Sequence, residues 1–364
     1  MTATVKKFIP RRLLGAYHFL IAYVAAVFYR FPSKKLLVIA VTGTKGKSSV
    51  TEMIHEILEE AGYRTALSNS IRFTVSDKSE RNLTRMSMPG RFFIQRFLRQ
   101  ALGAGCTAAV LEMTSEGALQ HRHRAVELNA LVFTNLAPEH IERHGSYEAY
   151  ADAKFEIGRQ LARSKKRPRA IVANADDPQS ARYLQLPVEK RIGFVLSDHA
   201  PYEAGERGGH FHFGDTDISI RLPGEFSLKN AIAAAHVTRC FGIDVAVIAR
   251  AIEKLATIPG RGERIDEGQS FTVVVDYAHT PDSLRALYEA YAAPRQSSGP
   301  KRKLICVLGN TGGGRDTWKR PVMGEIADQM CDVVYLTNED PYDEDPRSIV
   351  DEMAAGMSAQ GGSA

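Results

Sequence analysis

A glycine-rich turn that ends in Lys and Ser is the segment of this sequence best suited to chemistry. Residues 41–49 read VTGTKGKSS, after an apolar run at residues 36–40 and before a helical pattern over residues 50–61. In a strand–turn–helix unit the backbone N–H groups of the turn point toward phosphate oxygens, a lysine adds positive charge and a serine hydroxyl can ligate Mg²⁺. The segment predicts a nucleoside triphosphate site formed by Gly43, Thr44, Lys45, Gly46, Lys47, Ser48 and Ser49.

The turn departs from the usual six-position loop, because Val41 stands where that loop has its first glycine. The pattern is therefore the shorter TGTxGKS variant. A glycine-rich turn that arose by chance after a strand is the plain alternative, and the Lys and Ser together argue against it.

Further polar residues follow strand-like runs, where an α/β nucleotide enzyme keeps its chemistry. Glu112 ends the run at residues 107–111 and suits a Mg²⁺ ligand, while Asn135 and His140 follow residues 130–133. Lys154 lies two turns into a helical pattern. Taken singly, each of these residues also fits the interpretation of an ordinary solvated side chain without a function.

The pattern of apolar residues predicts an α/β fold. Runs at residues 107–111, 130–133 and 170–173 are apolar on both faces, as in a buried parallel sheet, and alternate with helical patterns. Strand-like pieces at 191–195, 209–213 and 218–222 predict a small antiparallel flap.

A second alternation of strands and helices begins after the break at residues 258–263. It predicts an incomplete Rossmann-like unit with a thin sheet of three strands. We therefore expect an N-terminal helix at 1–35, a central P-loop ATP-binding domain with a parallel sheet at 36–258, and a C-terminal domain at 259–364.

The charge distribution argues against nucleic-acid binding. Seven of the 47 basic residues lie within residues 1–35, which contain no Asp or Glu, and the remainder holds 40 basic and 42 acidic residues. The body is thus not basic, although the whole-chain pI is about 8.9. The four cysteines show no CxxC pair or metal spacing, which favours buried free thiols in a reducing cytosol.

Between the N-terminal basic clusters lies a stretch of seventeen mostly apolar residues, 13–29, at the short limit for a bilayer span. Three interpretations remain open: a helix packed on the protein's own body, a helix lying on an anionic membrane surface, and a span. We take it as a helix on the cytoplasmic side, with contact to the inner face of the membrane through residues 11–30.

Together, these motifs resemble in order and spacing the Mur ligase family of ATP-dependent amide-bond-forming enzymes, and most of all its UDP-N-acetylmuramoyl-tripeptide synthetases (the MurE type). The sequence DYAHTPDSL at residues 276–284 is the most specific motif, supported by PGRGE at 259–263 and GGGRDTWKRP at 312–321. The resemblance covers roughly residues 36–350.

The resemblance implies a role for each matching residue. Two Mg²⁺ sites would use Ser48, Glu112, His140 and a carbamylated Lys154, with Lys47, Lys154, Arg261 and Lys319 as catalytic residues. Further nucleotide contacts would come from Asn135, from Asn230 near the adenine, from Arg261 at the γ-phosphate and from Asp276 at the ribose. The remaining expected substrate contacts are Ser87, Arg91, Ser115, His279, Asp340 and Tyr342.

Three features depart from the MurE type. The UDP-binding N-terminal domain is missing here, and the apolar helix stands in its place. Tyr342 replaces the arginine that would pair with the far carboxylate of diaminopimelate, so lysine or another amino acid remains open. The chain also ends before the family's last strands and helices.

The implied activity is a cytoplasmic ligase that joins an amino acid to a carboxylate acceptor through an acyl phosphate, with small molecules as its partners. The favoured acceptor is a UDP-N-acetylmuramoyl-peptide of peptidoglycan synthesis. The alternatives are a ligase with another acceptor, of the folylpolyglutamate or pseudomurein type, and an inactive nucleotide-binding partner subunit. The acceptor, the amino acid and the oligomeric state are not given by the sequence.

Overall fold

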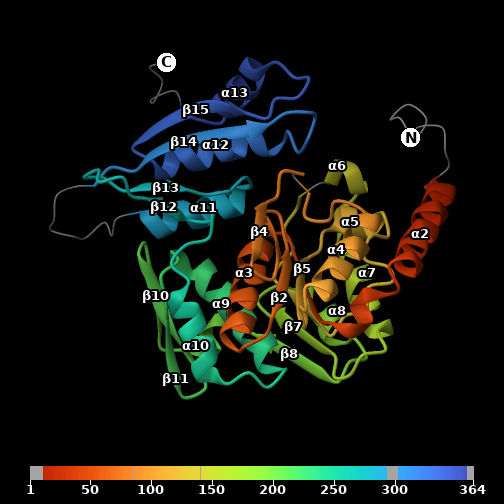
Figure 1. The fold of residues 1–364 in the computed structure, drawn as a ribbon. Coiled ribbons are helices and arrows are strands. Elements are labelled where there is room, and N and C mark those ends of the chain that lie inside the picture. The colour runs from red at the N-terminus through yellow and green to blue at the C-terminus, as the bar shows by residue number, and fades with distance from the viewer. Residues whose placement is uncertain (1–10, 85, 140, 293–301, 359–364) are drawn as a thin grey trace.

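The computed structural model describes residues 11–84, 86–139, 141–292 and 302–358 (Figure 1). The helices are α2 (Arg11–Phe28), η1 (Pro32–Lys35), α3 (Lys47–Glu60), α4 (Arg91–Gly103), α5 (Ser115–Leu119), α6 (Ile141–His144), α7 (Tyr147–Arg163), α8 (Ser180–Leu184), η2 (Leu196–His199), α9 (Gly224–Arg239), α10 (Val245–Lys254), α11 (Pro281–Tyr291), α12 (Lys319–Met330) and α13 (Pro346–Ala354). The strands are β1 (Leu37–Thr42), β2 (Thr65–Ser68), β3 (Arg72–Val75), β4 (Lys78–Arg81), β5 (Ala108–Glu112), β6 (Ala130–Phe133), β7 (Ala170–Asn174), β8 (Lys190–Phe194), β9 (Tyr202–Gly205), β10 (Gly208–Phe213), β11 (Thr216–Ile220), β12 (Glu263–Ile265), β13 (Val273–Val275), β14 (Ile305–Thr311) and β15 (Val333–Glu339).

An eight-stranded sheet of order β4-β3-β2-β5-β1-β6-β7-β8 forms the centre of the first domain. The six strands from β2 to β8 in this order run parallel, whereas β3 pairs antiparallel with β2 and β4 pairs antiparallel with β3. Since β1 lies between β5 and β6, the carboxyl ends of these three strands meet at one edge. This arrangement brings the phosphate loop, Glu112 and residue 134 close together.

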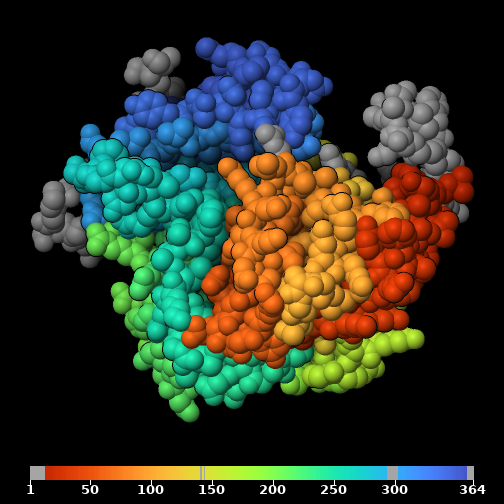
Figure 2. All heavy atoms as spheres, in the orientation of Figure 1, coloured from red at the N-terminus to blue at the C-terminus, as the bar shows by residue number. Residues whose placement is uncertain are grey.

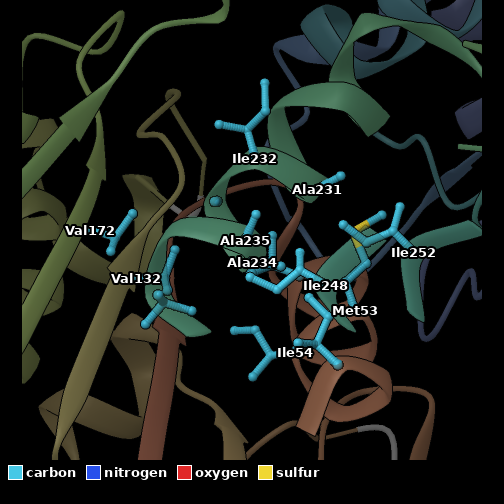
Figure 3. Packing of buried hydrophobic residues seen from close by; sticks show 14 of the residues in the cluster. Met53, Ile54, Val132, Val172, Ala231, Ile232, Ala234, Ala235, Ile248 and Ile252 are labelled. Carbon is cyan, nitrogen blue, oxygen red and sulfur yellow. The ribbon is translucent and has the colours of Figure 1, made fainter. Parts of the chain in front are cut away.

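Helices cover both faces of this sheet, so its central strands are apolar throughout. In β1, Ile39 and Val41 face a cluster with α3, α9 and α10, whereas Val38 and Ala40 face a cluster with α4, α5, α7 and α8. Figure 3 shows the first cluster, in which Met53 of α3 lies close to Ile248 of α10. The two packed layers hold the phosphate-loop edge rigidly.

The predicted flap is present, but one of its expected strands belongs elsewhere. Strands β9, β10 and β11 form an antiparallel sheet, whereas β8 pairs in parallel with β7 in the main sheet. Placing residues 191–195 in the flap was therefore wrong. The outward side chains of β8 are exposed because it is the edge strand, which gives it the half-polar pattern of a flap strand.

The second domain contains two small sheets instead of the expected sheet of three strands. Strands β12 and β13 form an antiparallel ribbon, and β14 and β15 form a parallel pair. Helices α11, α12 and α13 cover one face of that pair through residues such as Leu308, Met323 and Met353. Figure 1 places this domain above the phosphate-loop edge of the main sheet.

The expectation of four free thiols is wrong for two of them. Cys306 of β14 and Cys331, which follows α12, form a disulfide, because the strand and the end of the helix lie side by side. Cys106 and Cys240 are free and buried.

Helix α2 packs on the body of the protein beside α4 (Figure 2). Its inner face consists of small residues, Ala22, Ala25 and Ala26, which are almost fully buried. Of the helices that the structure describes, none is long and apolar enough to cross a membrane. This packing agrees with the first of the three interpretations, a helix packed on the protein's own body.

Candidate functional site

A cleft of about 750 Å³ lies between the carboxyl edge of the main sheet and the second domain. The phosphate loop, Glu112 and residues 134–137 form its first wall, and Arg261 with residues 276–279 forms the opposite wall. The lining includes most of the predicted site residues: Thr44, Lys45, Gly46, Lys47, Ser48, Ser49, Ser87, Glu112, Ser115, Asn135, Asn230, Arg261, Asp276 and His279.

Two glycines of the loop allow close backbone approach. Gly46 precedes α3 with a φ of 79°, and a Cβ there would overlap the side-chain oxygen of Asn230. A Cβ on Gly43 would overlap the hydroxyl of Thr134. The loop therefore has the form of a backbone cradle at a helix N-terminus, which suits phosphate oxygens.

The segment after β6 holds the loop in this shape. The backbone N–H of Lys45 donates to Oδ1 of Asn135 at 2.9 Å, and that of Thr44 donates to the Asn135 carbonyl at 2.8 Å. The Thr134 hydroxyl donates to the Lys45 carbonyl at 2.6 Å. Asn135, which we predicted to contact nucleotide, thus also positions the loop.

Replacing Gly46 by Ala is expected to lower ATP affinity by at least about tenfold. The left-handed backbone costs about 1–2 kcal/mol with a Cβ, and the overlap with Asn230 must also displace the loop. Titration with a fluorescent ATP analogue measures the effect.

Gly62→Ala is the matched control for this substitution. Gly62 has a φ of 84°, yet nothing lies within 4 Å of its Cβ position. This variant should lose comparable stability in thermal denaturation but keep its ATP affinity. Equal affinities of the two variants would contradict the role of the cradle.

Glu112 is the centre of a buried hydrogen-bond network at the end of β5. Its Oε2 accepts from the Ser48 hydroxyl at 2.9 Å and from the backbone N–H of Ser70 at 3.0 Å, and its Oε1 accepts from the Ser87 hydroxyl at 2.7 Å. The carboxylate, with only 3% exposure, is held firmly in the cleft wall. Ser48 and Glu112, both predicted magnesium ligands, are therefore in direct contact.

Lys154 lies behind the phosphate loop. Its Nζ donates to the Gly43 carbonyl at 2.6 Å and lies 4.6 Å from the centre of the Tyr150 ring. Burial, and next the charge of Lys47, lowers the pKa of Lys154 well below its usual value. Burial thus favours the uncharged form of this amine more than in an exposed lysine.

Arg261 extends from the second domain to Ser48, a predicted magnesium ligand of the first domain. Its Nη2 lies 3.3 Å from the Ser48 hydroxyl, and its guanidinium lies 4.6 Å from the Tyr277 ring centre. Asp276 accepts from the backbone N–H groups of Gly262 and Ala278 at 2.6 and 2.7 Å. Asp276 therefore fixes the turn that carries Arg261.

Glu139 links residues of both domains. Its Oε1 is 2.7 Å from His279 Nε2 and 3.4 Å from Lys45 Nζ, and Lys319 Nζ donates to the His279 carbonyl at 2.9 Å. Burial lowers the pKa of Lys45 to about 8 and also lowers that of Lys319. Such a concentration of cations around a cleft suits a polyanionic ligand.

Of the other predicted residues, Arg91 lies outside the cleft lining. Arg91 is directed toward α2, where it bonds to His18 and donates to the Gln120 carbonyl at 3.2 Å, so the structure does not bring it to the cleft. Asn230 is in the cleft but lies against the phosphate loop at Gly46. His140 lies outside the described residues.

Asp340 and Tyr342 lie just beyond β15, next to the glycine-rich loop of residues 312–314. The Asp340 carbonyl accepts from the Gly312 N–H at 3.1 Å, and the Tyr342 ring lies 4.8 Å from the guanidinium carbon of Arg315. Arg315 lines the cleft although these two residues do not. Tyr342 thus contacts a residue of the cleft wall.

Several polar residues of the cleft lining were missing from the predicted site, and four of them stand in two kinds of position. Arg315 lies inside the motif at residues 312–321, and Glu139 directly precedes the predicted ligand His140, so both positions could be recognised from the sequence. Ser70 and Arg122 lie in loops without such a motif. All four are lining residues: Ser70, Arg122, Glu139 and Arg315.

Comparison with known proteins identifies the family. Residues 41–238 match the Mur ligase middle domain, and residues 260–363 match the Mur ligase glutamate ligase domain. The chain is 36% identical over 346 residues to a UDP-N-acetylmuramoyl-L-alanyl-D-glutamate–2,6-diaminopimelate ligase of Syntrophomonas wolfei, covering 93% of this chain and 69% of the relative. It is 35% identical to a UDP-N-acetylmuramyl-tripeptide synthetase of Roseiflexus sp., covering 94% of this chain and 70% of that relative.

Among solved structures, the fold is similar to that of Mycobacterium tuberculosis folylpolyglutamate synthase complexed with ADP, with a TM-score of 0.73 and 18% identity over 92% of this chain and 82% of that one. The chain spans about 70% of the length of the two curated relatives. The predicted α/β fold, the MurE-like subgroup and the ATP-dependent ligase class, which uses Mg²⁺, are confirmed. The chain belongs to the Mur ligase family.

Proposed function

We propose that this protein joins an amino acid to the carboxylate of a UDP-N-acetylmuramoyl-peptide in peptidoglycan precursor synthesis. An acceptor oxygen attacks the γ-phosphorus of ATP, and ADP leaves. The amino group then attacks the acyl carbon, an amide bond forms, and phosphate and a proton leave. We assign ATP binding to the domain of residues 36–258. The opposite wall of the cleft is assigned to the domain of residues 259–364.

The contact of Ser48 with Glu112 inside a cleft lined by cations of both domains is the main support for this proposal. Carboxylate and triphosphate repel one another, so their reaction needs neutralisation and positioning above all. Lys45 and Lys47 of the loop and Arg261 of the second domain supply positive charge at the cleft. Lys319, held on the His279 carbonyl, adds to this charge next to the cleft.

The residues present fit magnesium. Hydroxyl and carboxylate oxygens, as on Ser48 and Glu112, are hard ligands of the kind that Mg²⁺ prefers. Among the described residues no three His, Cys, Asp or Glu side chains gather as a metal site. We propose that Ser48 and Glu112 hold one ion, and that a carbamylated Lys154 with His140 holds the second; bound Mg²⁺ would neutralise phosphate charge.

The environment of Lys154 supports the carbamate. An uncharged amine can attack CO₂, forming an N–C bond and releasing a proton, whereas an ammonium cannot. Because burial lowers the pKa of Lys154, that uncharged form is more accessible here than in an exposed lysine. The product carries a negative charge next to Lys45 and Lys47, whose cations stabilise it.

Phosphate release from ATP is the decisive test. Release that requires both the muramyl-peptide and an amino acid supports the ligase. Requirement for a different carboxylate would identify an enzyme with another acceptor, of the folylpolyglutamate or pseudomurein type. Release without either would indicate a hydrolase, and no release an inactive nucleotide-binding subunit.

Tyr342→Arg is expected to raise the preference for diaminopimelate over lysine by about tenfold or more. A guanidinium can pair with a second carboxylate through two hydrogen bonds, which a phenol cannot do. The ratio of kcat/KM for the two amino acids measures the effect. Tyr335→Arg, a change at another exposed tyrosine of the same domain, should leave the ratio unchanged; an unchanged ratio in both variants would remove Tyr342 from the amine site.

We also propose that the enzyme works in the cytoplasm, with residues 11–30 in contact with the inner face of the membrane. The surface that would make this contact extends beyond these residues.

A further inference from the structure

Helix α2 has its large apolar side chains on the outside. Residues spaced three or four apart form one stripe and are between 45% and 71% exposed. The opposite face carries the buried alanines of the α2–α4 contact. This reverses the usual surface helix, whose large apolar residues face the core. The stripe consists of Leu13, Tyr17, Leu20, Val24, Val27 and Phe28.

Helix α4 widens this stripe into a surface. Phe92 of α4 is 42% exposed, and its ring centre lies 6.4 Å from those of Phe28 and Tyr29. Arg96 and Arg99 are exposed on the same helix. Figure 2 shows red α2 beside orange α4 on one side of the molecule. We call the six stripe residues with Phe92, Arg96 and Arg99 the α2–α4 face.

The charges around this face indicate what kind of partner it binds. The first acidic residue of the chain is Glu52, and α4 contains none. Exposed cations follow the apolar stripe at Arg30, Lys34 and Lys35. A second copy would bring the same cations against this face and be repelled. An anionic lipid surface offers apolar depth and complementary charge together.

We propose that the α2–α4 face binds the surface of a membrane that contains anionic lipid. The stripe enters the boundary between headgroups and acyl chains while the cations contact the headgroups. Helix α2 keeps its packing on α4 and lies along the surface, so the protein is peripheral.

The bound face would also orient the cleft. On α2, His18 bonds to Arg91, and the Phe19 ring centre lies 5.9 Å from that of His121. The next residue, Arg122, lines the cleft. Membrane binding would thus bring this wall toward the lipid headgroups.

Flotation with vesicles tests the proposal using the full chain and no substrate, so its result is independent of the ligase activity. Vesicles of phosphatidylcholine with about one third phosphatidylglycerol should bind the protein, and pure phosphatidylcholine vesicles should bind it at least tenfold more weakly. Raising NaCl to 1 M should weaken the anionic binding strongly, because exposed charges are screened.

Two variants of the face separate its apolar and charged parts. Leu20→Ser with Val24→Ser, and separately Arg96→Glu with Arg99→Glu, should each reduce binding at least tenfold. The matched controls are Val307→Ser, an exposed apolar residue of β14, and Arg191→Glu, an exposed residue of β8; both should bind like the parent. Thermal denaturation confirms that all four variants are folded.

Equal binding by the parent and both face variants would overturn the proposal, as would equal binding to neutral and anionic vesicles. Sedimentation analysis provides a third outcome. A dimer that the Leu20→Ser, Val24→Ser variant loses, without vesicle binding by the parent, would assign the face to a second copy instead.

Discussion

Lys154→Ala is expected to reduce amide-bond formation by at least about 10²–10³-fold, the scale of a lost preorganised electrostatic contact. The substitution removes the only nitrogen at this position that could become a carbamate, and with it the negative charge proposed for the second magnesium site. Phosphate release in the presence of acceptor and amino acid measures the loss.

Short carboxylates such as acetate are expected to restore part of the activity of this variant, because the space left by the side chain can admit an anion. Lys154→Arg should be inactive and resist rescue, since a guanidinium fills the space and does not add CO₂. A ¹³C-labelled carbamate signal in the parent, absent from both variants, would identify the modification directly. Lys254→Ala, at an exposed lysine paired with Glu60, is the control. Full activity of Lys154→Ala would refute the role.

Glu112→Gln is expected to lower magnesium-dependent turnover by about 10²–10³-fold. An amide is close in size to the carboxylate, so the variant tests charge more than shape. Its NH₂ group replaces one acceptor oxygen and faces the donors that now surround Glu112, namely Ser48, Ser70 and Ser87. Turnover measured over a range of Mg²⁺ concentrations should show a higher requirement for the metal.

Glu148→Gln is the matched control, because Glu148 is exposed in the first turn of α7 and lies outside the cleft. Its turnover and magnesium requirement should stay within a factor of about two of the parent. If Glu112→Gln retained the parent's magnesium dependence, the ion could not be held by this carboxylate.

The sequence was most informative where chemistry follows a buried strand. Strands β1, β5 and β6 are continuous apolar runs, so their period, length and ends could be read directly. Because parallel neighbours end at one edge, Ser48 and Glu112 could be expected together although they are 64 residues apart. Lys154 could be placed on a helix, but its burial behind Gly43 follows from tertiary packing.

Positions fixed by loops and by contacts between distant segments could not be read in this way. Arg91 begins a helix, and only the packing of α4 on α2 directs its guanidinium toward His18. Arg122 follows a short helix in a loop without periodicity. The link between Cys306 and Cys331 depends on how α12 returns along β14. None of these arrangements leaves a repeating pattern in the residues.

The contact of Glu139 with His279 has a kinetic consequence. Glu139 belongs to the first domain and His279 to the second, and the same carboxylate also lies near Lys45 of the phosphate loop. Separation of the two domains would therefore break a contact of Glu139, which also lies beside the phosphate loop at Lys45. Opening of the cleft and exchange of nucleotide would thereby be coupled through one side chain, and weakening that contact would make release faster while leaving the reacting groups in place.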